Sequence, residues 1–126
     1  SFTSTWEFMG FVSWLAVDLT ADGDDRTVVR LAHTAATDND HWRTFGPAAT
    51  GIGWDLGLRG LGLHLDTGAS LDPAYEETWS LSSEGVAWIG ECGEAWYAAD
   101  TAGGAADADA RARAAACVAF LSTRYC

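Results

Sequence analysis

The stretch that decides the fold is residues 46–65, which reads GPAATGIGWDLGLRGLGLHL. Its apolar residues alternate with polar residues and glycines, and this is the period of a strand pair that turns at Arg59-Gly60. A helix also fits, because an apolar stripe recurs at i, i+4, i+7 and i+11: Trp54, Leu58, Leu61 and Leu65. A glycine inside a helix costs about 1 kcal/mol relative to alanine, so propensity favours strands. The local pattern leaves both structures open.

Upstream, residues 1–35 alternate apolar and polar side chains with a period of two. This period predicts antiparallel strands at residues 1–8, 13–20 and 27–35. The sequence ADGDD at residues 21–25 is a dense turn signal and predicts a hairpin between the last two strands. Its carboxylates lack the spacing and the distal glutamate of an EF-hand loop, so we interpret it as a turn rather than a calcium site.

Two segments are predicted to connect larger elements. Residues 37–44 form a polar crossing in which Asp38 or Asp40 can cap a helix. Residues 67–73 are interpreted as a linker. Met9-Gly10 is interpreted as a turn or bulge between the first two strands.

Two amphipathic helices are predicted at the C-terminal end. Ser82 or Ser83 is suited to cap the first helix, which ends near residues 103–104. The second begins near Asp107, where an acid favours a helix N-terminus, and has Arg124 near its end. Its expected apolar stripe is Ala110, Ala114, Cys117, Val118, Leu121 and Tyr125.

The charge of the chain is one-sided, with 18 acidic residues against 7 basic ones and a formal net charge of −11. Such a surface repels phosphate backbones and anionic lipid headgroups, so neither nucleic acid nor a membrane is an expected partner. The three cysteines form no CxxC pair, which argues against a disulfide framework and favours the reducing cytoplasm. Every basic residue is arginine, and this composition is typical of GC-rich bacterial genomes.

Several short motifs occur in a characteristic order: Thr5-Trp6-Glu7-Phe8, Val12-Ser13-Trp14, Leu31-Ala32-His33-Thr34, Trp42-Arg43-Thr44-Phe45-Gly46-Pro47, Gly51-Ile52-Gly53-Trp54-Asp55-Leu56 and Gly60-Leu61-Gly62-Leu63-His64-Leu65. In this order they resemble the C-terminal half of bacterial SRPBCC (START-like) proteins grouped with homologues of the Hsp90 ATPase activator. The similarity is close over residues 2–66 and looser in the tail.

The resemblance implies an α+β helix-grip fold, in which an antiparallel β meander is packed by a long helix at residues 46–65, with two further C-terminal helices. The glycines of the long helix would then pack against the sheet. Residues 1–66 would be the C-terminal half of the domain and residues 67–126 a helical extension packing on it. The family's N-terminal half is missing here. We therefore expect a fragment, a complementing N-terminal half from another chain, or a homodimer.

The function that the resemblance implies is non-catalytic binding of a hydrophobic small molecule in an apolar pocket. The expected ligand-binding residues are Trp6, Leu15, Val17, Leu31, His33, Trp54, Leu58 and Leu61. Any one of them taken singly is more often plain core.

Two alternatives stay open. One is a cyclase- or hydrolase-type enzyme that uses His33, with His64 and Asp55 as further titratable candidates. The other is a co-chaperone-like module that binds proteins. The sequence has no Ser-His-Asp or Cys-His spacing, phosphate loop or metal-ligand cluster, so we predict no catalytic residues, no metal and no cofactor.

Overall fold

The computed structural model describes residues 1–8 and 10–123 and has a three-stranded antiparallel sheet and five helices. The predicted α+β class is confirmed. By contacts, the chain divides into two compact units, a sheet unit at residues 1–39 and a helical unit at residues 40–126. The expected boundary after residue 66 concerns the family domain and stays a prediction.

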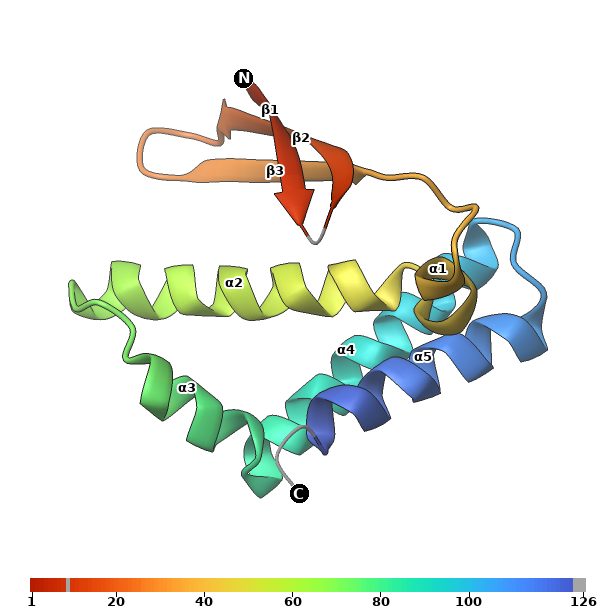
Figure 1. Ribbon diagram of the computed structural model, residues 1–126. Helices are drawn as coiled ribbons and strands as arrows, with labels where there is room; N and C mark the ends of the chain where they lie inside the picture. The colour runs from red at the N-terminus through yellow and green to blue at the C-terminus, as the bar shows by residue number, and fades with distance from the viewer. Residues whose placement is uncertain (9, 124–126) are drawn as a thin grey trace. The chain divides into compact units, whose positions relative to one another are not determined.

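The sheet unit is a meander of three strands in the order β1-β2-β3: β1 (Phe2–Phe8), β2 (Phe11–Ala21) and β3 (Thr27–Thr34) (Figure 1). The predicted strands and hairpin are confirmed. In the hairpin turn, the Asp22 N–H donates to the Arg26 carbonyl at 2.9 Å. Gly23 has a φ of 82°, a left-handed conformation that glycine adopts without a steric penalty. In the other predicted turn, Gly10 also has a positive φ, and Met9 lies outside the described residues.

The strand register determines which side chains share a face. Leu15 lies opposite Ser4 on β1 and His33 on β3, and residues directly opposite each other point to the same side of a sheet. One side, which we call the apolar sheet face, consists of Phe2, Ser4, Trp6, Phe8, Phe11, Ser13, Leu15, Val17, Leu19, Ala21, Thr27, Val29, Leu31 and His33. The other, the mixed sheet face, consists of Thr3, Thr5, Glu7, Val12, Trp14, Ala16, Asp18, Thr20, Val28, Arg30, Ala32 and Thr34.

The helical unit contains α1 (Asp40–Phe45), α2 (Ala48–Thr67), α3 (Pro73–Ser80), α4 (Ser83–Ala102) and α5 (Asp107–Ser122). Helices α4 and α5 run side by side (Figure 1). The helix that the family resemblance predicts at residues 46–65 is confirmed as α2, and the strand-pair alternative is wrong. Within the described part of the chain, no helix combines the length and the apolar character needed to cross a membrane.

The prediction of two helices after residue 66 is wrong, because α3 adds a third. The Asp72 side chain caps α3 by accepting a hydrogen bond from the Ala74 N–H at 2.9 Å, and Pro73 occupies the first turn, where its missing N–H costs nothing. The linker predicted for residues 67–73 therefore ends at this cap. The predicted polar crossing likewise contains α1, which begins at Asp40.

The predicted starts of the last two helices are confirmed. The Ser82 hydroxyl accepts a hydrogen bond from the Gly85 N–H at 3.1 Å, and α4 ends just before Gly103. Helix α5 begins at Asp107. Its buried stripe is Ala110, Ala114 and Cys117. Two residues of the C-terminal prediction, Arg124 and Tyr125, lie outside the described residues.

The core of the helical unit forms where α2, α4 and α5 meet. Its buried residues are Ala48, Ile52, Ile89 and Cys117. A methyl group placed on Gly51 would lie 2.0 Å from Cε2 of Trp96, so α2 can approach this indole only through a glycine. The same indole donates its N–H to Asp55 Oδ2 at 2.7 Å. The indole of Trp96 therefore fixes α2 against α4.

The glycines of α2 have different roles. Gly51 adjoins Trp96, and Gly60 adjoins Leu71 at 3.0 Å. Within the helical unit, the neighbour of Gly60 is therefore Leu71, and the packing of the α2 glycines against the sheet stays a prediction. A methyl group on Gly53 or Gly57 would meet no heavy atom within 4 Å.

These contacts predict opposite effects for two nearby glycine substitutions. Gly51→Ala forces the rigid indole of Trp96 to move, and we expect it to lower the free energy of unfolding by about 1–3 kcal/mol. Gly53→Ala adds a methyl in open space and should raise that free energy by up to about 1 kcal/mol through helix propensity. Urea unfolding followed by far-ultraviolet circular dichroism measures both. Equal stability of the two variants would contradict the packing described for Gly51.

Candidate functional site

The apolar sheet face brings together all five ligand-binding residues predicted on strands: Trp6, Leu15, Val17, Leu31 and His33. These residues share one side because the pairing of β1 with β2 and the pairing of β2 with β3 are both continuous, without a bulge that would shift the register. Leu15 is buried, whereas large apolar side chains around it are exposed: Phe2, Trp6, Phe8, Phe11, Leu19 and Val29. The face is therefore apolar and largely uncovered.

A small polar network lies within this face. The Ser13 side chain is buried, with 7% of its residue surface exposed, and its hydroxyl donates to the Trp6 carbonyl at 3.1 Å. His33 Nε2 lies 2.7 Å from the same hydroxyl oxygen. Which of the two groups donates in this second hydrogen bond depends on the tautomer of the imidazole. Burial lowers the pKa of His33 below its ordinary value of 6.5.

Ser13 was not among the predicted site residues. Its position in the sequence indicates a place in the site. Ser13 is two residues from Leu15 on the same strand, so the two side chains point to the same side of the sheet. A polar side chain at such a position needs a hydrogen-bond partner, and the register provides His33 diagonally across β2 and β3.

The Ser13–His33 pair has the distance of a nucleophile and its base. The Ser13 hydroxyl also lies within hydrogen-bond distance of the Trp6 carbonyl, which competes with His33 for the hydroxyl proton. The described contacts therefore show how these two side chains are oriented, and the direction of the hydrogen bond between them depends on the tautomer of His33.

Helix α2 brings together the remaining predicted residues, Trp54, Leu58 and Leu61, and aligns Leu65 with them. We call these four residues the outer face of α2. By the helical period they lie opposite Ile52, which is in the core. The exposed fractions of Leu58, Leu61 and Leu65 are 44%, 43% and 73%. Helix α2 therefore has two apolar faces, and only the inner one packs in the core of the helical unit.

The other titratable candidates on α2 have structural partners. Asp55 accepts the hydrogen bond from Trp96 and is also hydrogen-bonded to the Cys92 thiol. Burial, reinforced by the Asp55 carboxylate, raises the pKa of Cys92 to about 11, so this thiol stays protonated at neutral pH. His64 Nδ1 lies 2.8 Å from the Ala69 carbonyl just beyond the end of the helix.

Arg59 also has structural partners within the helical unit. Its guanidinium carbon lies 3.4 Å from the centroid of a Trp79 ring, and its Nη1 donates to the Glu76 carboxylate at 2.7 Å. Both side chains of this ion pair are mostly buried. The stacking and the ion pair together hold α3 against α2.

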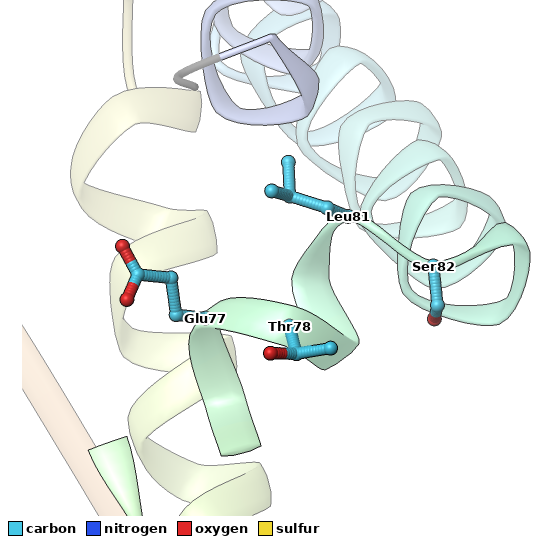
Figure 2. Close-up of a pocket in the computed structure, with 4 residues that line it drawn as sticks. All are labelled: Glu77, Thr78, Leu81 and Ser82. Atoms are coloured by element: carbon cyan, nitrogen blue, oxygen red, sulfur yellow. The ribbon is translucent and has the colours of Figure 1, made fainter. Parts of the chain in front are cut away.

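Two hollows occur on the surface of the described residues. One, of about 490 Å³, adjoins Glu77, Thr78, Leu81 and Ser82, whose side chains point in different directions in Figure 2. The other, of about 410 Å³, adjoins Thr3, Ser4, Thr5, Trp14, Leu15, Ala16 and Thr34. Of the eight predicted ligand-binding residues, Leu15 alone borders either hollow. The predicted residues thus lie on one face of each unit, and these two hollows are not formed by them.

Comparisons with protein-family models, with curated proteins and with solved structures found no match to this chain. Among residues 1–8 and 10–123, no group of three or more His, Cys, Asp or Glu side chains is placed to hold a metal ion.

The burial of His33 predicts a specific pH dependence. Because the pKa of His33 is lower in the folded chain than its ordinary value of 6.5, the unfolded chain takes up the proton first as the pH falls. The stabilising contribution of neutral His33 is thus complete above about pH 6.5 and is lost as the pH falls towards the folded pKa.

The measurement is an NMR titration of the His33 ring, in which we expect a midpoint below 6.5. His33→Gln is the control, because its amide keeps a donor for Ser13 but does not titrate. Between about pH 7.5 and 5.5 the wild type should lose more unfolding free energy than this variant. A midpoint at or above 6.5 would contradict the burial argument.

Proposed function

We propose that this chain binds a hydrophobic small molecule without catalysing its conversion, and that it does so as a member of the SRPBCC helix-grip family. In this proposal α2 is the grip helix, and each unit contributes an apolar surface for the ligand: the sheet unit its apolar sheet face, and the helical unit the outer face of α2. The observation that carries the proposal is that each unit has an uncovered apolar face built from the residues expected to bind the ligand.

Leaving such apolar faces in contact with water costs free energy. Each square ångström of apolar surface removed from water contributes about 25 cal/mol, so covering a few large side chains supplies several kcal/mol. Phe8 and Phe11, which lie opposite each other on β1 and β2, are each more than three-fifths exposed, and so is Leu65 on the helical unit. Contiguous exposed apolar surface, such as the Phe8–Phe11 pair begins, usually marks a binding site.

The absence of catalysis is proposed from the polar groups present. The serine hydroxyl on the apolar sheet face donates its proton to a backbone carbonyl, and Asp55 on α2 is engaged with Trp96. Neither group is arranged to take a proton from a substrate. The enzyme alternative based on His33 is therefore the weaker reading of the same residues.

The second candidate is a role in protein interaction, including a homodimer or a complementing N-terminal half. The observation that favours it is the sheet order: β1 and β3 are the edge strands of the described sheet, and each pairs on one side with β2. An edge strand has unpaired backbone donors and acceptors that another strand can extend. β1 has a single charged residue, Glu7, to oppose such pairing.

Sedimentation velocity tests this second candidate. If edge pairing operates, residues 1–126 should sediment as a dimer at micromolar concentration in about 0.15 M salt, which screens the net charge. A monomer across the whole concentration range would count against pairing between copies of this chain.

The binding proposal is tested by placing a carboxylate on the outer face of α2. We expect wild type to bind Nile red, an uncharged apolar dye, saturably, and Leu58→Asp to weaken this binding about tenfold or more because the charge would be buried without a partner. Titration of the dye fluorescence measures both affinities.

Leu81→Asp is the matched control. Leu81 is a leucine of similar exposure, 40% against 44% for Leu58, and it adjoins the hollow shown in Figure 2. The Leu81→Asp variant should bind Nile red with the same affinity as wild type. No saturable binding to wild type would refute the proposal, and a loss in Leu81→Asp alone would move the site to that hollow.

A further inference from the structure

The charged side chains of the sheet unit lie on one face only. On the described strands, Glu7, Asp18 and Arg30 all belong to the mixed sheet face, and the one titratable side chain on the apolar sheet face is that of His33. The outer face of α2 is uncharged as well. Both surfaces assigned to the ligand are therefore free of formal charge.

The arginines of the described chain are engaged elsewhere. Five of them form ion pairs with carboxylates: Arg26, Arg43, Arg59, Arg111 and Arg113. Arg30 lies on the mixed sheet face, and Arg124 lies outside the described residues. Among residues 1–8 and 10–123, no arginine is placed on either ligand-binding face to pair with an anion.

Three polar side chains on the apolar sheet face, Ser4, Ser13 and His33, have hydrogen-bond partners. The Ser13 hydroxyl donates to the Trp6 carbonyl and lies 2.7 Å from His33 Nε2, and the Ser4 hydroxyl donates to the Thr5 carbonyl at 3.0 Å. Because burial lowers the pKa of His33, its imidazole is uncharged at neutral pH. The face thus offers a polar centre without a counter-charge.

An anionic ligand would bind such a surface poorly for two reasons. Its headgroup would lose water without gaining an ionic partner, and burying an unpaired charge is far more costly than burying apolar surface. The net charge of −11 also repels anions at long range. Neither cost applies to an uncharged molecule of the same hydrocarbon length.

We propose that the ligand is electrically neutral, so that the chain selects uncharged hydrocarbon-rich molecules and rejects carboxylates of the same chain length. This inference rests on the proposed binding function and narrows its ligand class. The distribution of charge over the two sheet faces carries it, together with the ion pairs that occupy the arginines.

The test compares 1-decanol with decanoate at about pH 8, where a carboxylate is ionised. Their affinities for the complete chain are measured by tryptophan fluorescence and confirmed by isothermal titration calorimetry. We expect wild type to bind 1-decanol at least about ten times more tightly than decanoate.

Two neighbouring valines on β3 provide a matched pair of variants. Val29 is on the apolar sheet face and Val28 is on the mixed sheet face, with similar exposed fractions of 45% and 53%. Val29→Lys places a cation beside the proposed ligand, and it should shift the affinity ratio towards decanoate about tenfold. Val28→Lys adds the same charge on the other face and should leave the ratio unchanged. Circular dichroism confirms that both variants are folded.

The outcomes separate the inference from the function on which it rests. If decanoate binds wild type as tightly as 1-decanol, the inference is wrong and the binding function stands. An equal shift in Val28→Lys and Val29→Lys overturns the inference as well, because overall charge rather than the apolar sheet face would then set the preference. If neither compound binds, both the function and the inference fail.

Discussion

The indole ring of Trp96 lies against the bare backbone of α2 at Gly51 and donates its N–H to Asp55 one turn further along the helix. This contact sets the rotation of α2 in the helical unit. With Gly51 and Asp55 turned towards α4, Ile52 enters the core and the four residues of the outer face point away from it. An alanine at Gly51 would clash with the indole, so the close approach of α2 to Trp96 requires glycine at this position.

The sheet unit depends on a different constraint, the period of two along its strands. Unbroken registers on both sides of β2 put every charged strand residue on one face and the apolar side chains on the other. Within the apolar sheet face, Ser13 and His33 satisfy each other by a hydrogen bond of 2.7 Å. A face that is apolar, uncharged and internally hydrogen-bonded is suited to contact neutral apolar matter, and this property links the sheet to the proposed ligand.

The acidity of the chain has a structural counterpart. With 18 acidic residues and 7 arginines, most carboxylates have no cation to pair with, whereas five arginines of the described residues are each matched to one carboxylate. Arg59 makes two of these contacts at once, because it forms an ion pair with Glu76 and stacks on the ring of Trp79, with most of its side chain buried. Three of these ion pairs, those of Arg59, Arg111 and Arg113, join different helices, and the two faces proposed to bind the ligand have no Asp, Glu or Arg.

Much of the fold could be predicted from local pattern. The period of two determined the strands and the sharing of a face by Leu15, Leu31 and His33, and helix-start residues such as Ser82 and Asp107 determined where α4 and α5 begin. The Asp72-Pro73 start signal of α3 is equally local.

Residues 46–65 could not be assigned in this way, because two apolar faces and six glycines satisfy the strand period and the helix period alike. Family resemblance pointed to the helix, and only tertiary packing against Trp96 and Leu71 decided which glycines are buried and which leucines stay exposed. Ser13 is a second case in which local pattern was insufficient. The alternation along its strand predicts which side of the sheet Ser13 faces. Its partner His33 is 20 residues away, so their hydrogen bond forms only once the strands have paired.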